Sequence, residues 1–150
     1  MTQKVLAKPV YWLKLEDCER LFKAFQKKLE FNEPIPPFET RYEGRLEAIL
    51  ESARQTFGKK LLYPTILDVS SVYFNHIVRG HPFQNGNKRM GLLFTHVFLL
   101  IHAIDFTLNY EEMLSFALII ALSGINKISS EETKELCKDI IYKYTKGFAV

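Results

Sequence analysis

The stretch His81-Pro82-Phe83-Gln84-Asn85-Gly86-Asn87-Lys88-Arg89 lies between two apolar segments, residues 66–78 and 90–104, that both have the spacing of helices. It supplies one titratable base, amides, two cations, a glycine and one aromatic side chain of a kind that is usually buried. Because Gly86 to Arg89 opens the second helix, its backbone N–H groups should face outward at the positive end of the helix dipole, where phosphate binds. A base beside an anion site is the minimum needed to move a phosphorus-centred group onto a hydroxyl, so this stretch is the predicted active site.

The composition is that of a globular protein, and we predict one domain over residues 1–150. Hydrophobic residues make up 47% of the 150 positions and aromatic residues 13%, enough to bury a core without disulfides or metals. The formal net charge is only +3, from 20 basic and 17 acidic side chains spread along the chain. No basic recognition helix stands out, so direct binding to nucleic acid is not expected.

The two cysteines, Cys18 and Cys137, lie far apart and fit apolar helix faces, without the spacing of a metal site. We therefore expect both to be reduced core residues in a reducing compartment, the cytoplasm. The N-terminus has no apolar region typical of a signal peptide. The longest apolar run, residues 90–104, is shorter than the ~20 residues that span a bilayer, so no membrane association is expected.

The apolar spacing predicts an all-α single domain, a bundle of five or six helices. Helices are expected over residues 15–29 and 43–57, and a third ends in the usual way at Arg79-Gly80. The segment 87–104 is apolar nearly all round, which is typical of the buried central helix of a bundle. The capping pairs that start the third helix and the last two are Thr65 with Asp68, Asn109 with Glu112, and Ser129 with Glu132.

Two stretches interrupt the helical pattern. Residues 32–37 contain three prolines and are interpreted as a connector. Residues 57–64 contain a glycine, two lysines and exposed-looking leucines, which suits a short β-hairpin, or flap. Loops of this kind often bind partners, although an ordinary surface turn is the alternative interpretation.

The side chains of the predicted active site have complementary chemistry. His81 follows a helix and takes a proton near neutral pH, so it can deprotonate a hydroxyl as that hydroxyl attacks. Gly86 permits a ligand to approach the backbone, and Phe83 is expected to plug the loop into the core. The side chains that suit phosphate are Asn87 by hydrogen bonding, Lys88 by its mobile charge and Arg89 by its planar fork. The alternative is a polar interhelical loop whose asparagine caps a helix.

At these residues the sequence resembles a known family. His81 to Arg89 is similar to the signature of the Fic/Doc (Fido) proteins, His-Pro-Phe-x-(Asp/Glu)-Gly-Asn-(Gly/Lys)-Arg. The resemblance extends to Gly44-Arg45, residues 50–53 and Leu62-Tyr63-Pro64, and covers roughly residues 40–125. It is closest to the Doc (death-on-curing) branch.

The resemblance implies a function as well as a fold, a helical bundle of the Fido type with a short β-hairpin flap. It implies a protein adenylyltransferase, or a kinase-like phosphotransferase, that uses ATP or another nucleoside triphosphate with Mg²⁺ to modify a Ser, Thr or Tyr hydroxyl of a target protein. His81 would be the general base. Gly86, Asn87, Lys88 and Arg89 would bind the phosphates. Leu61, Leu62 and Tyr63 would form the flap that docks the target by strand addition.

The chain departs from the family pattern at two positions. Asn85 stands where the family has an Asp or Glu that coordinates Mg²⁺, and an amide oxygen binds a hard cation without charge. Lys88 stands where adenylylating members commonly have glycine, and lysine is the Doc-like residue. These departures leave open a second function, a degenerate Fido module that binds nucleotide or a partner protein without turnover.

Two further patterns bear on regulation and on metals. Family members are often restrained by a Ser/Thr-x-x-x-Glu-Gly/Asn helix. The nearest match, Thr107 to Glu111 followed by Glu112, is interpreted instead as a helix N-terminus. The resemblance to the Doc branch implies a toxin, and if the protein is restrained, the inhibitor would be a separate antitoxin protein. His76 has no third ligand to share with His81, so it is interpreted as a partly exposed helix histidine.

Overall fold

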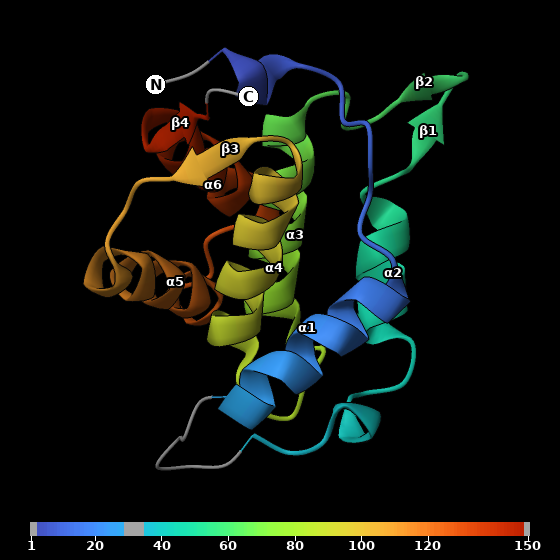
Figure 1. The fold of residues 1–150 in the computed structure, drawn as a ribbon, viewed down its shortest axis with the longest axis vertical. Helices are drawn as coiled ribbons and strands as arrows, with labels where there is room; N and C mark the ends of the chain where they lie inside the picture. Colours follow the sequence, from blue (N-terminus) through green and yellow to red (C-terminus); the bar gives the residue numbers. More distant parts are fainter. Residues whose placement is uncertain (1–2, 29–34, 149–150) are drawn as a thin grey trace.

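The computed structural model describes residues 3–28 and 35–148. Within these ranges the chain is mostly helical, as the sequence predicts, with six α-helices and two small antiparallel sheets of two strands each (Figure 1). The helices are α1 (Leu15–Lys28), α2 (Arg45–Ser52), α3 (Ile66–Gly80), α4 (Asn87–Ile101), α5 (Tyr110–Ile125) and α6 (Ser130–Lys143). The strands are β1 (Thr56–Phe57), β2 (Lys60–Leu61), β3 (Ile104–Phe106) and β4 (Thr145–Gly147), and short 3-10 helices span Lys4–Leu6 and Phe38–Thr40.

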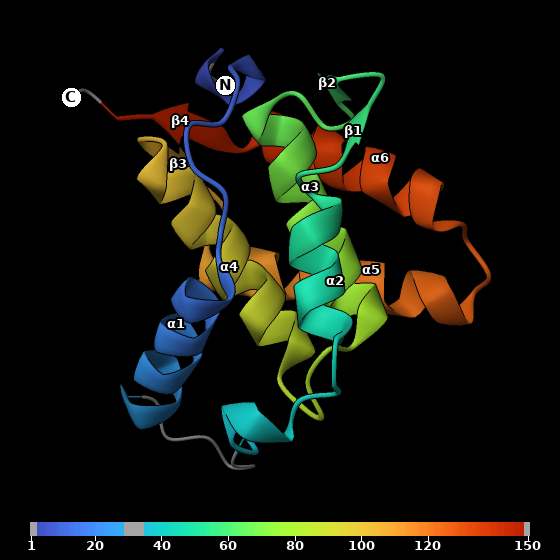
Figure 2. The ribbon, with the colours of Figure 1, turned by 90° about the vertical axis from the view of Figure 1, so that its right-hand side faces the viewer.

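The antiparallel pair α3 and α4 forms the centre of the bundle, and the other four α-helices surround it (Figures 1 and 2). The two helices approach closely because Gly91 of α4 has no side chain. A β-carbon at this position would lie only 2.8 Å from Cγ2 of Val78 in α3. The close packing holds the end of α3 and the start of α4 together, and the active-site stretch predicted above joins them.

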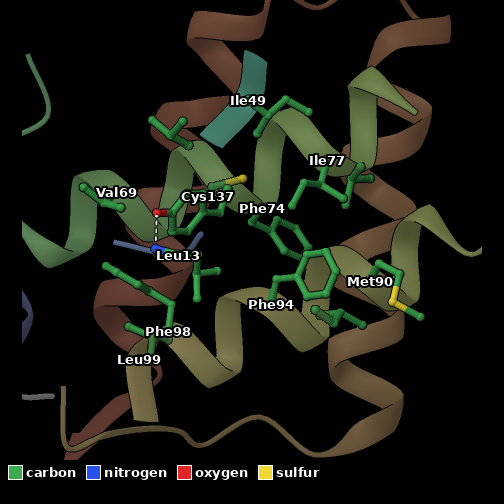
Figure 3. Packing of buried hydrophobic residues seen from close by; sticks show 14 of the residues in the cluster. Leu13, Ile49, Val69, Phe74, Ile77, Met90, Phe94, Phe98, Leu99 and Cys137 are labelled. Carbon is green, nitrogen blue, oxygen red and sulfur yellow. Dashed lines mark hydrogen bonds between the residues drawn. The ribbon is translucent and has the colours of Figure 1, made fainter. Parts of the chain in front are cut away.

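Aromatic side chains fill the core between these helices. Tyr73 of α3 lies edge-on to Phe98 of α4, with ring centroids 5.1 Å apart, and Phe74 stacks on Phe116 of α5 at 4.3 Å. The Tyr73 hydroxyl also accepts a hydrogen bond from the backbone N–H of Leu13 at 3.0 Å, so this buried polar atom has a partner. Figure 3 shows side chains of α3 and α4, among them Phe74 and Phe98, pointing into one continuous core.

The predicted capping pairs are confirmed. Thr65 with Asp68 and Asn109 with Glu112 form complete capping boxes at the starts of α3 and α5. The Ser129 side chain accepts from the N–H of Glu132 at the start of α6. Residues 107–111 therefore lead into a helix N-terminus, as the sequence predicted. Local side-chain chemistry fixes these boundaries, which is why they can be read from sequence.

Other predicted boundaries were wrong. The second helix spans Arg45–Ser52 rather than 43–57: Gly44 precedes it in the left-handed conformation, and Thr56–Phe57 pairs with Lys60–Leu61 as a β-hairpin. The fourth helix ends at Ile101 rather than 104, because Ile104–Phe106 pairs with the distant strand Thr145–Gly147. Helical periodicity cannot reveal a pairing between segments so far apart in sequence. The predicted end of the first helix, Leu29, and part of the proline-rich connector lie outside the described residues.

Cys18 and Cys137 are fully buried, free thiols, as predicted. Burial raises the pKa of the Cys18 thiol to about 12, and it raises the pKa of Cys137 as well. Among the described helices, none is long and apolar enough to cross a membrane.

Candidate active site

The loop between α3 and α4 begins at an unusual backbone position. The third helix continues through Gly80, and it is His81 that adopts the left-handed conformation, with φ 47° and ψ 59°. The sequence predicted that Arg79-Gly80 ends this helix, and α3 does end at Gly80; the residue in the left-handed conformation is His81 rather than the glycine. A non-glycine residue rarely adopts this conformation, although histidine does so more often than most. Gly86, with φ 81°, completes the loop and precedes α4.

Phe83 fastens the middle of the loop to the core. Its side chain is 2% exposed, and its ring lies 5.0 Å from that of Phe22 in α1, 6.0 Å from Phe38 and 6.1 Å from Phe94 in α4. The aromatic contacts come from three separate segments of the chain. The position of the loop is therefore fixed by the packing of the whole bundle.

Asn87, the first residue of α4, holds the loop in shape. Its Oδ1 accepts from the backbone N–H of Phe83, and its Nδ2 donates to the Phe83 carbonyl, both at 2.9 Å. These two bonds fix the orientation of the amide. If it were reversed, Nδ2 would face the Phe83 N–H, donor against donor, and Oδ1 would face the Phe83 carbonyl, acceptor against acceptor. In this structure the buried amide serves the loop backbone. A contact with phosphate is not part of this geometry.

His81 is exposed, and Asn87 orients its ring. The Nδ2 of Asn87 lies 3.4 Å from Nδ1 of His81, and that Nδ2 is a donor. Nδ1 is therefore the acceptor of this contact, and the proton of a neutral ring is on Nε2. To take a proton from a hydroxyl, the imidazole must turn its Nδ1 away from Asn87 or move its own proton. Solvent exposure leaves room for this rotation.

The loop and the first turn of α4 enclose a polar pocket of about 350 Å³. This volume is at the lower end of the range for small-molecule sites. The start of α4 presents backbone N–H groups and the positive end of its dipole here, and Lys88 and Arg89 add charge. The lining residues are His81, Gln84, Asn85, Gly86, Asn87, Lys88, Arg89 and Leu114.

A second, smaller pocket of about 130 Å³ adjoins the first, and the two share Arg89 and Leu114. Its wall is mainly apolar and comes from α1, α4 and the start of α5. The remaining lining residues are Phe25, Leu92, Leu93, His96, Tyr110 and Met113. His96 is held by Asp105, with Nε2 and Oδ1 3.1 Å apart. Sequence reasoning missed this pocket, because residues on three helices converge only after folding.

A polar loop at a helix start, beside a titratable histidine, is the arrangement expected of the signature stretch. The family comparison covers the elements that build it: residues 14–99, from just before α1 to near the end of α4, match the model of the Fic/DOC family. The chain belongs to the Fic/DOC family. Members of this family are typically nucleotidyl- or phosphotransferases. A search of the curated proteins found no match.

In this Fic/DOC domain the residues near the pocket are poorly suited to hold a metal ion by themselves. Asn85 is exposed, and its Oδ1 accepts from the N–H of Gly86 at 2.7 Å. The residues that line the pocket include no carboxylate. The described part of the chain also has no cluster of three His, Cys, Asp or Glu side chains that could hold a metal. Mg²⁺ normally needs one or two carboxylates besides phosphate oxygens, so the donor set does not fit a bound Mg²⁺.

The structure does not bring Leu61, Leu62 and Tyr63 to the active-site loop. They precede α3, whereas His81 follows it, and a helix of this length is roughly 22 Å long. Figure 1 shows the β1–β2 hairpin and the α3–α4 loop at opposite ends of the molecule. The hairpin was predicted correctly, but its position separates it from the histidine.

The segment that does touch the active-site loop precedes α2. The N–H of Tyr42 donates to the Pro82 carbonyl at 2.9 Å, and Nε2 of Gln84 donates to the Thr40 carbonyl at 3.0 Å. Ile35 packs so closely over Gly86 that a β-carbon there would lie 3.1 Å from its Cδ1. This segment forms one edge of the loop, and nothing in its own sequence indicated that role.

Proposed function

We propose that this protein transfers AMP or phosphate from ATP, or another nucleoside triphosphate, to a Ser, Thr or Tyr hydroxyl of a target protein. One observation carries the proposal: His81 opens into the same pocket as the start of α4, Lys88 and Arg89. A proton acceptor and a set of phosphate-binding donors are thereby placed within one cavity.

In the proposed reaction, the hydroxyl oxygen bonds to phosphorus while its proton passes to the His81 ring. If the α-phosphate is attacked, its bond to the oxygen that bridges to the β-phosphate breaks, and pyrophosphate leaves. If the γ-phosphate is attacked, ADP leaves. The N–H groups of α4 and the Arg89 guanidinium would stabilise the negative charge that develops on the phosphate oxygens. No step is assigned to Mg²⁺, because the pocket residues do not form a site for it.

The adjoining apolar pocket supports the choice of a nucleotide. A nucleoside base is flat and largely apolar, and the wall contains the aromatic side chains of Phe25 and Tyr110 together with aliphatic residues of α4 and α5. Arg89 lies at the junction of the two pockets. A nucleotide with its base in the apolar pocket would thus place its phosphates toward the start of α4.

Transfer from ATP labelled at the α- or γ-phosphate, in the presence of cell lysate, tests the proposal and separates its two forms. Label from the α-phosphate would mark AMP transfer, and label from the γ-phosphate would mark phosphate transfer. We expect His81→Ala to lower the rate by roughly 10²–10⁴-fold, the usual contribution of a general base.

His102→Ala is the matched control, because His102 lies just after the far end of α4 and bonds to the Phe98 carbonyl. Its transfer rate should stay near that of the unchanged protein. Absence of labelled protein under all metal conditions, or transfer that His81→Ala leaves unchanged, would contradict the proposal.

The second candidate function is nucleotide or partner binding without turnover, and Asn85 favours it. Asn85→Asp restores a carboxylate to the pocket rim, so we expect Mg²⁺ to bind more tightly in the presence of ATP. Gln55→Glu adds the same charge at an exposed position outside the pocket and is the control. If transfer appears only in Asn85→Asp, the natural protein is a binding module. If the unchanged protein already transfers label, this candidate fails.

Target docking is proposed at the segment of residues 35–42. It lies along the active-site loop, whereas the hairpin lies about the length of α3 away. The assignment to the Doc branch, action as a toxin in the cytoplasm and restraint by a separate antitoxin protein also remain proposals. The assignment to the Doc branch, and with it the toxin, rests on Lys88. The separate antitoxin rests on residues 107–112, because they belong to a capped helix start and not to an inhibitory helix.

A further inference from the structure

A cleft of about 500 Å³ is lined by Gly80, the residue before His81, and is separate from the polar pocket at the start of α4, the proposed nucleotide pocket. Its lining residues come from α2, the end of α3 and the start of α6; in Figure 1, α2 and α6 lie on either side of α3. The lining residues are Arg45, Ala48, Ile49, His76, Arg79, Gly80 and Ser130. The cleft and the nucleotide pocket share no residue, but the neighbouring residues Gly80 and His81 line one each.

The two arginines of the cleft are held in place by other parts of the fold. The guanidinium of Arg45 lies 4.4 Å from the centre of the Tyr42 ring, and its Nη1 donates to the His81 carbonyl at 3.3 Å. Nη1 of Arg79 donates to Oγ1 of Thr133 in α6 at 2.9 Å. Side chains that are already ordered lose less entropy when they bind a ligand.

The cleft is positively charged, and no acidic side chain among its lining residues neutralises this charge. No carboxylate is among its lining residues, and neither Arg45 nor Arg79 forms an ion pair with a described acidic side chain. Glu131, the acid whose charge acts on His76, is paired with Lys134 at 2.9 Å. Arginines that are fixed but not neutralised are typical of sites that bind carboxylate or phosphate.

His76 reports the same electrostatic environment. Burial is the main cause that lowers the pKa of His76, and the nearby positive charge of Lys134 lowers it further. The charge of Glu131 raises it, and Arg79 adds a smaller lowering effect. An anion in the cleft would oppose this lowering. Ala48 and Ile49 add apolar surface to the cleft, so it suits a peptide segment better than a free ion.

We propose that this cleft binds an acidic segment of the target protein, with its carboxylates against Arg45 and Arg79. The inference rests on the proposed function, because it assumes that the substrate is a protein. The position explains its use: Gly80 lines the cleft and His81 lines the nucleotide pocket, so a segment held in the cleft lies next to His81. The cleft would select targets whose modified hydroxyl has acidic neighbours.

Binding of two blocked peptides to the full chain, followed through the imidazole NMR signals of His76, tests the inference. One peptide contains a serine among glutamates, and in the other each glutamate is replaced by glutamine. We expect a saturable shift with the glutamate peptide only. Arg45→Glu should weaken that binding by roughly tenfold or more, because it both removes an attraction and adds a repulsion.

Two further variants keep the test sharp. Lys60→Glu makes the same charge change on the exposed hairpin and should leave binding unchanged. Arg79→Gln removes the charge of the second arginine and should also weaken the binding of the glutamate peptide. Equal binding of the two peptides, no shift at all, or an equal response to inorganic phosphate would overturn the inference.

The outcome does not depend on catalysis. His81→Ala should still bind the glutamate peptide even though its transfer is lost. Transfer of label without selective peptide binding would overturn the cleft inference alone. Selective peptide binding without any transfer of label would instead count against the proposed function.

Discussion

The backbone of His81, the proposed general base, is held in the strained left-handed conformation. A non-glycine residue in this conformation costs about 1–2 kcal/mol, so contacts elsewhere must hold it there. Three such contacts are visible: Tyr42 donates to Pro82, Arg45 donates to the His81 carbonyl, and Asn87 clamps Phe83. The effect is to direct the imidazole away from α3 and toward the pocket at the start of α4.

At this scale the sharpest prediction concerns Asn87. Asn87→Ala removes both hydrogen bonds to the backbone of Phe83, which is buried, so the free energy of unfolding should fall by ~1–3 kcal/mol. Transfer should fall as well, because His81 loses its orienting partner. Chemical denaturation and the labelled-ATP assay measure the two effects.

Gln84→Ala is the control for Asn87→Ala. It removes one exposed hydrogen bond, to the Thr40 carbonyl, from the same loop. The expected change in the free energy of unfolding is below ~0.5 kcal/mol. If both variants lose equally little stability, the amide of Asn87 does not hold the loop.

At the scale of elements, the pair α3 and α4 decides the geometry of the site. The loop that joins them is short, so the spacing between the helices sets the distance between His81 and the first turn of α4. Gly91 permits that spacing by removing the side chain that would meet Val78. Burial along α3 and α4, from Ile66 to Leu99, keeps the pair at the centre of the bundle.

This contact predicts that Gly91→Ala changes the free energy of unfolding in the direction opposite to the usual one. Replacing a glycine inside a helix by alanine usually adds ~1 kcal/mol of stability. Gly91→Ala should instead lower the free energy of unfolding by ~1 kcal/mol or more, because its β-carbon would meet Val78. In the Val78→Ala background, where Cγ2 is absent, the same change should raise it. Denaturation curves of the four proteins measure both effects.

Gly124→Ala, in α5, is the comparison for Gly91→Ala. A β-carbon there would have only ordinary contacts, 3.7 Å from the Arg79 side chain. This variant should be slightly stabilised in the natural background. If Gly91→Ala is equally stabilised, the contact between α3 and α4 tolerates a methyl group, and Gly91 does not set the helix spacing.

At the scale of the whole molecule, the two cysteines lie in different outer helices, Cys18 in α1 and Cys137 in α6, and both are fully buried. A thiol reacts as its thiolate, and burial raises the pKa of Cys18 to about 12. We expect both to be alkylated only when the bundle unfolds, with the same dependence on denaturant. Measuring the rates in Cys18→Ala and Cys137→Ala reports each thiol separately.

Reaction of Cys137 at a much lower denaturant concentration would contradict this expectation, because it would mean that α6 detaches before the rest of the bundle unfolds.

The raised pKa of Cys18 also makes the stability of the fold depend on pH. In the unfolded chain the thiol ionises near its usual value of 9.0, whereas in the folded protein it stays neutral to about 12. The contribution of this burial is therefore complete below pH 9 and is lost as the pH rises toward 12.

The sequence by itself determined what depends on neighbours along the chain. The helix starts at Asn109 and Ser129 follow from side chains three residues apart, and the helical class follows from apolar spacing. The signature from His81 to Arg89 identified the family, because its residues are contiguous and their chemistry needs no distant partner.

Only the tertiary structure decided what depends on segments that meet after folding. It paired Ile104–Phe106 with Thr145–Gly147 and set residues 35–42 along the active-site loop. It also gathered Arg45 and Arg79 around one cleft and set Tyr110 beside Arg89 in another. Such contacts depend on how helices pack, and packing depends on the shapes of many side chains at once, which no local pattern records.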